Sequence, residues 1–462
     1  MIKKDGFIYS EDLKTILGFD EDYEFGEEIF IPEGVEEITI ELKTVSMLLA
    51  NPIKKVHIPK SLFESSCEPS LTFFPAKTFV IPDGIEEIPA SFFLQNSSVE
   101  NVIIPPSVKK IGSKAFAHCQ NLKNIDISNI EIIGEYAFTG TRLTSVEITN
   151  NTKNIEPGTF AYCIFLETLM YDTETDVPAD FCNGCVNLKN IFINDNVKKI
   201  KQSAFMQCFS MHEIKLPKAL KEILTSAFCD TGLYEICFGD DIELISNFAF
   251  SKCSSLSNIT FPEKAKIELQ FEAFSQCNLL KHVVLPKSVE FLGQSTFAWC
   301  ENLKSIEIQS KVKEIPKGFA TQCKKLSSVK LPDTIEKIEP IAFYGCNLKD
   351  INDILKSVKL IDEDAFSCNP IERLYFRNNT VIKKSAFSGL TDLKLVLALN
   401  NDLDLDSETF GDTPIKGIKK FSIFKKKSFE SIGFETVSKD ELIIKLLDDF
   451  SFKDTSSIIN TI

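Results

Sequence analysis

The sequence predicts a solenoid, in which short coils stack on one another, rather than a set of globular domains. A phenylalanine-centred unit recurs fifteen times, and successive anchors are 21 to 24 residues apart. Such a period is typical of solenoids, because one coil cannot bury its own apolar face and must stack on its neighbours. The anchors are Phe93, Phe116, Phe138, Phe160, Phe181, Phe205, Phe228, Phe250, Phe274, Phe297, Phe319, Phe343, Phe366, Phe387 and Phe410.

Each unit predicts one strand and then a second apolar pair. A clear copy is Ala115-Phe116-x-x-Cys119-x-x-Leu122-x-x-Ile125-x-Ile127. Its Ile-x-Ile step has period two, so alternate residues face into and out of a strand. A proline such as Pro217 often follows and ends the ladder, because it lacks an N–H. Coils stacked about 4.8 Å apart then form a parallel sheet and columns of identical side chains.

This pattern closely resembles the BspA-like class of leucine-rich repeats, over about residues 30–411. The resemblance implies a curved, right-handed leucine-rich-repeat solenoid of about 22–23-residue coils, with its parallel sheet on the concave face. It also implies a role in protein or surface recognition, as in adhesins and surface antigens. Fold alone does not fix function, so these remain expectations.

Three regions follow from the period. Residues 1–29 are predicted to form an N-terminal cap, residues 30–411 the repeat solenoid, and residues 412–462 a C-terminal cap. Ser438-x-x-Glu441 is a capping box before an apolar run, which predicts a short helix near 439–450. We expect this helix to cover the open end of the core, as the terminal repeats of solenoids do.

Composition and charge limit the partners and the compartment. A net charge of −15 argues against nucleic acid, because the array has no basic footprint. Neither a signal-peptide run nor a membrane-spanning stretch is visible, which favours a cytoplasmic protein. The family resemblance favours the alternative, a protein exposed at the cell surface.

Nine of the fourteen cysteines occupy one slot, three or four residues after an anchor phenylalanine. We interpret them as reduced, buried thiols that act as small apolar wedges. Neighbours about 5 Å apart would also allow disulfides. The C-x-x-C at Cys182 and Cys185 has no second pair at metal spacing. The nine are Cys119, Cys163, Cys185, Cys208, Cys253, Cys277, Cys300, Cys323 and Cys346.

No pattern in the sequence indicates catalysis. The four histidines lie in separate coils, and the common nucleophile, zinc and nucleotide motifs are absent. Carboxylates are abundant but scattered along the coils, where charged residues are usually solvated. We therefore predict no catalytic, cofactor or metal site, and a protein that is not an enzyme.

The strands predict the binding surface. Residues on either side of the first inward residue should face outward, which places Met170 and Phe192 side by side in adjacent coils. Exposed large apolar groups on a polar face are typical of interface hot spots, although single apolar residues on a surface are common. The candidate contacts in these columns are Met170, Phe192, Lys215, His282, Lys330, Arg373 and Tyr375.

A second candidate surface is the lysine-rich segment Lys416–Lys427, in which aromatic residues alternate with lysines. It resembles a stretch that binds anionic lipid, an edge strand that its lysines protect from pairing, or ordinary solvated charge. The favoured function is a non-enzymatic module that binds another protein through the concave sheet. The alternative is a surface-exposed adhesin or antigen that binds host matrix or glycans.

Overall fold

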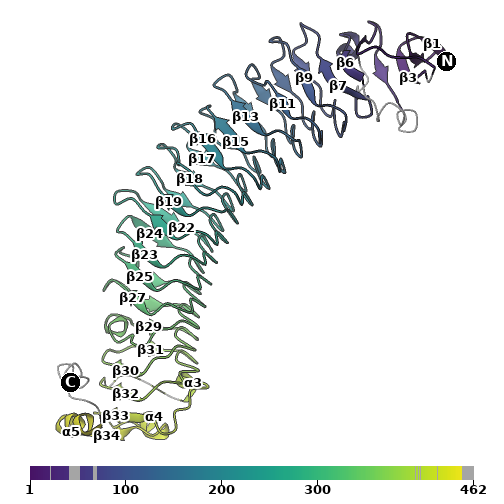
Figure 1. Cartoon of the computed structure of the whole chain (residues 1–462). Coiled ribbons are helices and arrows are strands. Elements are labelled where there is room, and N and C mark those ends of the chain that lie inside the picture. The colour runs from purple at the N-terminus through teal and green to yellow at the C-terminus, as the bar shows by residue number, and fades with distance from the viewer. Residues whose placement is uncertain are drawn as a thin grey trace. The chain divides into compact units, whose positions relative to one another are not determined.

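The structure is a computed structural model that describes residues 1–20, 22–40, 53–65, 70–400, 402–403, 405, 407–423 and 425–449. It divides into two compact units, Met1–Ile242 and Glu243–Ile462. Within each unit the chain winds through stacked coils whose strands lie side by side (Figure 1).

In the unit Met1–Ile242, most coils contribute two strands. The first comes from the Leu-x-x-Ile-x-Ile phrase and the second from the apolar pair that follows it. The first strands are β4 (Glu28–Phe30), β6 (Ile53–His57), β7 (Ala76–Val80), β9 (Asn101–Ile103), β11 (Asn124–Ile125), β13 (Ser145–Ile148), β15 (Thr168–Tyr171), β16 (Asn190–Ile193) and β19 (Glu235–Cys237). The second strands are β5 (Glu37–Ile38), β8 (Glu87–Ile88), β10 (Lys110–Ile111), β12 (Ile132–Ile133), β14 (Asn154–Ile155), β17 (Lys199–Ile200) and β18 (Glu222–Ile223).

The unit Glu243–Ile462 repeats this arrangement. Its first strands are β21 (Asn258–Thr260), β23 (His282–Leu285), β25 (Ser305–Ile308), β27 (Ser328–Lys330), β30 (Arg373–Phe376), β32 (Leu395–Ala398) and β33 (Lys419–Ser422). Its second strands are β20 (Leu244–Ile245), β22 (Ile267–Leu269), β24 (Val289–Leu292), β26 (Glu314–Ile315), β28 (Lys337–Ile338), β29 (Leu360–Ile361) and β31 (Val381–Ile382). Short helices are few, with α3 at Ser407–Phe410 and a 3-10 turn at Ile354–Lys356.

Coils pair in parallel and in register, as the repeat predicts. In one ladder Ser145 pairs with Thr168, and Thr168 pairs with Asn190. Along β13 the side chains alternate between exposed and buried, so each strand has one face in the core and one in solvent. The parallel solenoid predicted from the sequence is therefore confirmed, while the concave placement of the sheet stays a prediction.

The phenylalanine column forms the centre of the core. All fifteen anchor rings are buried, with at most 1% of any of them exposed. Phe93, Phe116 and Phe138 stack with ring centroids 5.0 and 5.2 Å apart and nearly parallel planes. Elsewhere in the column a ring turns edge-on, as Phe181 does against Phe160 at 5.4 Å. Both geometries are favourable for aromatic pairs, so the column continues where the stacking changes.

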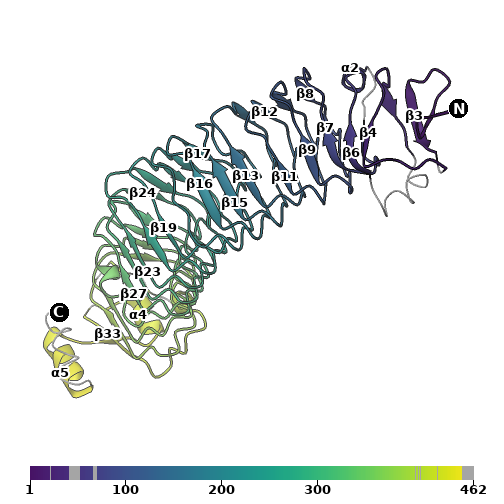
Figure 2. The same ribbon diagram turned by 45° about the horizontal axis from the view of Figure 1, so that its top comes forward.

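The ends of the chain depart from the repeat. Strands β1 (Ile2–Lys4), β2 (Phe7–Tyr9) and β3 (Thr15–Phe19) pair antiparallel, and β3 joins the coils by pairing in parallel with β5. At the other end, β34 (Glu435–Thr436) follows α4 (Lys427–Ser431), and a longer helix follows β34. That helix, α5, spans Lys439–Asp449 and lies beside β33 (Figure 2). The boundaries of the two caps stay predictions.

The first-strand ladder is interrupted at several coils of the described chain. Within the two units, breaks follow β11, β16, β21 and β27, and residues 211–217 form no strand. The first inward residue of a coil is normally buried, but it is half-buried in the coils that precede a break. These half-buried residues are Ile125, Ile191, Ile214, Ile259 and Val329.

The stacked rings predict the cost of removing one. We expect Phe116→Ala to lower the free energy of unfolding by about 3–5 kcal/mol, because Phe116 is fully buried between two rings and its loss leaves a cavity. Chemical denaturation followed by circular dichroism measures this. Phe291→Ala is the matched control, since 51% of that side chain is exposed. Equal midpoints for the two variants would contradict the core assignment.

Candidate functional site

In each unit the outward residues of the first strands form a surface, called here the strand face. Met170 on β15 and Phe192 on β16 are directly paired in register, and 40% and 44% of their side chains are exposed. Most of their neighbours in the same columns are polar or charged and also exposed, such as Glu147 and Asp126. The structure therefore brings together the two apolar residues that the sequence singled out.

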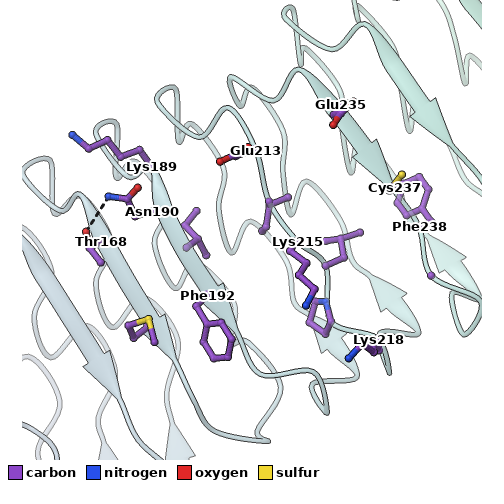
Figure 3. Close-up of a pocket in the computed structure, with 16 residues that line it drawn as sticks. Thr168, Lys189, Asn190, Phe192, Glu213, Lys215, Lys218, Glu235, Cys237 and Phe238 are labelled. Carbon is purple, nitrogen blue, oxygen red and sulfur yellow. Dashed lines mark hydrogen bonds between the residues drawn. The ribbon is translucent and has the colours of Figure 1, made fainter.

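A depression of about 860 Å³ opens in the strand face beside Phe192 (Figure 3). It extends over four coils, from Thr168 on β15 to Cys237 on β19, where the ladder is broken. Met170, Phe192, Ile191 and Ile214 supply its apolar lining. Its volume falls within the range of about 300–1,000 Å³ that is usual for small-molecule sites, but the depression is shallow and open to solvent.

Charged side chains lie at both ends of the depression along the strand direction. Glu213 and Glu235 lie at one end together with Lys189, and Lys215 and Lys218 lie at the other (Figure 3). Lys218 forms an ion pair with Asp195 at 2.5 Å, and this hydrogen bond holds the pKa of that carboxyl below its ordinary value. The site therefore offers one end of mixed charge, one apolar centre and one basic end.

Two other predicted contacts belong to the strand face of the unit Glu243–Ile462. His282 on β23 is exposed, and its Nδ1 lies 2.8 Å from Ser305 Oγ. Lys330 on β27 is also exposed and forms an ion pair with Glu307 at 3.4 Å. Both face outward as expected, and their role in binding stays a prediction.

The expectation that Tyr375 is exposed is wrong. Only 8% of Tyr375 is exposed, because Leu442 and Leu446 of α5 pack in the same apolar cluster. Its strand neighbour Arg373 is half-buried, and a hydrogen bond between the two side chains is among the influences on the pKa of Tyr375. Burial is the largest influence and raises that pKa. Neither residue lies on an open surface.

The edge-strand interpretation of Lys416–Lys427 is also wrong. β33 lies inside its sheet, paired with β32 on one side and with β34 on the other. Phe421 is buried beneath α5, and Lys420 is only 9% exposed, with its Nζ 2.7 Å from Ile415 O. Burial lowers the pKa of Lys420. Phe424 lies outside the described residues, and Phe421 presents no apolar surface to a membrane.

Beside the depression, the sequence reasoning missed three exposed aromatic residues. Phe165, Phe209 and Tyr234 lie in turns of the coils that border the depression, and 42%, 48% and 52% of their side chains are exposed. Tyr234 stacks on His212 with ring centroids 4.7 Å apart. The sequence signal that could have found them is a large apolar residue in a turn. Other coils mostly have a polar residue there, such as Asn121.

The cysteine slot has a hydrogen-bonding role that the sequence did not reveal. Eight of its thiols donate to a backbone carbonyl of the preceding coil, at Sγ···O distances of 3.0–3.3 Å. Asn96 and Asn369 occupy the same position and donate through Nδ2 to Phe74 O at 3.0 Å and Phe343 O at 2.8 Å. This position therefore favours a small side chain that donates a hydrogen bond, because a buried carbonyl oxygen without a partner costs free energy.

Two further searches gave negative results. Within the described ranges, His, Cys, Asp and Glu side chains form no group of three or more that is able to hold a metal ion. None of the helices in the part of the chain that the structure describes is long and apolar enough to cross a membrane.

A stack of parallel coils with a recurrent Leu-x-x-Ile-x-Ile strand defines a leucine-rich-repeat protein. The chain belongs to the BspA-type leucine-rich repeat family, whose profile matches residues 56–177, 175–304 and 291–416. No curated protein sequence matches the chain.

Several solved structures are similar in fold. A leucine-rich repeat protein from Bacteroides ovatus is 20% identical, with 95% of this chain and 97% of that chain covered and a TM-score of 0.57. The pneumococcal vaccine antigen PcpA is 16% identical, with 95% and 97% covered and a TM-score of 0.41. A leucine-rich cell surface protein from Faecalibacterium prausnitzii is 21% identical, with 86% and 93% covered and a TM-score of 0.36.

The burial of the thiols predicts their reactivity. Among the thirteen described cysteines, we expect only Cys237 and Cys368 to react readily with a thiol reagent in the native protein, because the others are buried. Burial raises the pKa of the Cys119 and Cys346 thiols to about 12, so they stay protonated and poorly nucleophilic at neutral pH. Mass spectrometry of the alkylated protein measures this, with the denatured protein as control. Rapid native alkylation of Cys119 would contradict it.

The raised pKa of the Cys119 thiol predicts that the stability of the protein depends on pH. The Cys119 thiol has a folded pKa of about 12 against an ordinary value of 9.0, so its contribution to stability is complete below pH 9. Between pH 9 and 12 the unfolded state loses this proton first, and the free energy of unfolding falls. Denaturation midpoints of the wild type and Cys119→Ala, measured below pH 9 and at about pH 10.5, test this. An equally steep fall in both proteins would count against the assignment.

Proposed function

We propose that this chain is a non-enzymatic module that binds another protein through its strand face, at the depression beside Met170 and Phe192. Leucine-rich repeats present long, repetitive surfaces that suit an extended protein partner. A shallow face with charged ends and an apolar centre suits such a partner better than a small molecule, which prefers a deep apolar pocket.

One observation carries the proposal. In the unit Glu243–Ile462, the outward apolar residues Tyr375, Leu397 and Phe421 are covered by α5 of the same chain. Met170 and Phe192 occupy the equivalent outward positions on β15 and β16, and both are exposed. The helix α5 therefore covers outward apolar residues on β30, β32 and β33. The outward apolar residues on β15 and β16 are exposed instead.

The neighbouring side chains enlarge the exposed apolar surface, which supports a protein as the partner. Phe165, Phe209 and Tyr234 extend the exposed apolar surface to the turns of the same coils. Aromatic residues within a polar rim are typical of the few residues that supply most of the binding energy at interfaces. Lys215, at the basic end of the depression, is well placed to orient an acidic group of the partner.

The double variant Phe192→Ser/Met170→Ser tests the proposed function. Proximity labelling of the tagged protein in its source cells identifies partners, and calorimetry with the purified partner gives the affinity. We expect the double variant to bind at least about tenfold more weakly, because it removes the apolar centre of the site. Its thermal stability should stay close to that of the wild type, since both side chains are exposed.

Val284→Ser is the matched control. Val284 lies on β23 in the same outward column, and 49% of its side chain is exposed, but it does not line the depression. The control should keep the affinity of the wild type. A double variant that retained full affinity for the partner would eliminate this site.

A further inference from the structure

At the depression, a partner meets side chains of the strand face and not a free strand edge. Residues 211–217 fill the coil that follows β16, although they form no strand. The backbone N–H groups of Ser210 and Ala219 donate to carbonyls of the preceding coil at 3.0 Å, so this coil keeps the spacing of its neighbours. The groups open to a partner are therefore exposed side chains, among them Met170 and Phe192.

This arrangement limits which backbone conformation suits the partner. An extended segment laid over these side chains would leave its own N–H and C=O groups without partners above an apolar surface, which costs free energy. An α-helix satisfies its backbone groups internally and presents only side chains. Its diameter of about 10–12 Å also suits a depression that extends over four coils about 4.8 Å apart.

The chain itself contains a helix bound to this kind of surface. Leu442 and Leu446 of α5 are fully buried, and they pack with three outward apolar residues of β30, β32 and β33, which are Tyr375, Leu397 and Phe421. Because the two leucines are four residues apart, they lie on one face of the helix, about 6 Å apart along its axis. That separation is close to the spacing of neighbouring strands, about 4.8 Å.

The depression offers the same column of positions with one difference. Met170 and Phe192 pair in register on successive strands, as the outward residues of β30 and β32 do. The third position carries Lys215, whereas β33 carries Phe421 there. Lys215 instead favours an acidic residue at the corresponding place of the partner, while Lys218 beside it is already in an ion pair at 2.5 Å.

The end of mixed charge adds a basic residue to the helix that fits. Lys189 at this end is already in an ion pair with a carboxylate of the preceding coil, at 2.8 Å. Among the described residues, no ion pair holds Glu213 or Glu235, which line the same end. A basic residue beside the apolar pair can therefore bind these carboxylates, as Lys445 of α5 binds Glu435 at 3.0 Å.

We infer that the depression beside Met170 and Phe192 receives an amphipathic helix of the partner protein. The helix places two large apolar residues, four apart in its sequence, on these side chains, and a basic residue beside Glu213 and Glu235. Anchoring through residues four apart is a general way in which helices bind apolar grooves. This inference deepens the proposed function and rests on it, because it names the structural element that the site recognises.

A peptide with the sequence of α5 tests the inference on the full chain. The probe is residues 436–449, Thr-Val-Ser-Lys-Asp-Glu-Leu-Ile-Ile-Lys-Leu-Leu-Asp-Asp, with fluorescein at its N-terminus and an amidated C-terminus. Fluorescence anisotropy measures its binding. We expect saturable binding that Phe192→Ser/Met170→Ser weakens about tenfold or more, while Val284→Ser leaves it unchanged. No saturable binding up to about 1 mM peptide, or full binding to the double variant, would overturn the inference.

Lys215→Phe is a variant that should gain affinity. It gives the depression three apolar residues in successive coils, as β30, β32 and β33 have. We expect it to bind the peptide about tenfold more tightly, because the added ring buries further apolar surface of the helix. Val284→Phe is the matched control, since it adds a ring to the same column outside the depression and should leave the affinity unchanged. Equal gains in both variants would contradict the inferred site.

A proline in the peptide distinguishes a bound helix from a bound extended segment. The side chain of Ile444 is 59% exposed in α5, so packing does not require it. Ile444→Pro in the peptide breaks the helix and should weaken binding about tenfold or more, whereas Ile444→Ala keeps the helix and should bind as the parent peptide does. Equal affinities of the two altered peptides would rule out a helix as the bound form.

The outcomes also distinguish this inference from the proposed function. If the purified partner loses affinity for the Phe192→Ser/Met170→Ser variant while the α5 peptide neither binds nor competes with it, the protein-binding site stands and the inference fails. Self-association of the free chain that Phe192→Ser abolishes would also overturn the inference, because a second copy would then occupy the depression.

Discussion

The structure depends on one constraint, which is that no coil can satisfy its own polar backbone or bury its own apolar face. Phe116 N–H donates to Ala137 O of the next coil, and the Cys119 thiol donates to Phe93 O of the preceding one. The stacked rings of Phe93, Phe116 and Phe138 lie at the same spacing as these hydrogen bonds. Because burial and hydrogen bonding have the same period, each coil is stable only in the presence of its neighbours.

That constraint holds even where the ladder of first strands is interrupted. Around Glu213 the ladder is interrupted, and residues 211–217 form no strand. The core continues beneath it, because Phe205 and Phe228 remain buried and stacked at 5.5 Å. The interruption of the ladder therefore leaves the core intact.

The period alone predicted the fold, because the anchor positions and the alternation of Ile-x-Ile depend only on local spacing. It also predicted that Met170 and Phe192 would be exposed neighbours. It failed for Tyr375 and for the lysine-rich segment, since both are covered or paired by residues that follow the repeat, and no local rule places α5 on β30 and β33. The hydrogen-bonding role of the cysteine slot could have been predicted from the sequence. Asn96, Asn369 and Thr413 share that position, and all three can donate a hydrogen bond.

Outward apolar residues gather at two places on the strand face, and the two places differ in whether those residues are covered. On β30, β32 and β33 the outward apolar residues are covered by α5, so they contribute to the core of the unit. On β15 and β16 the same outward positions carry Met170 and Phe192, and none of the described residues covers them to that extent. Leaving both exposed forgoes the free energy that burial releases, roughly 25 cal/mol per Å² of apolar surface. A partner that covered these two side chains would recover that free energy.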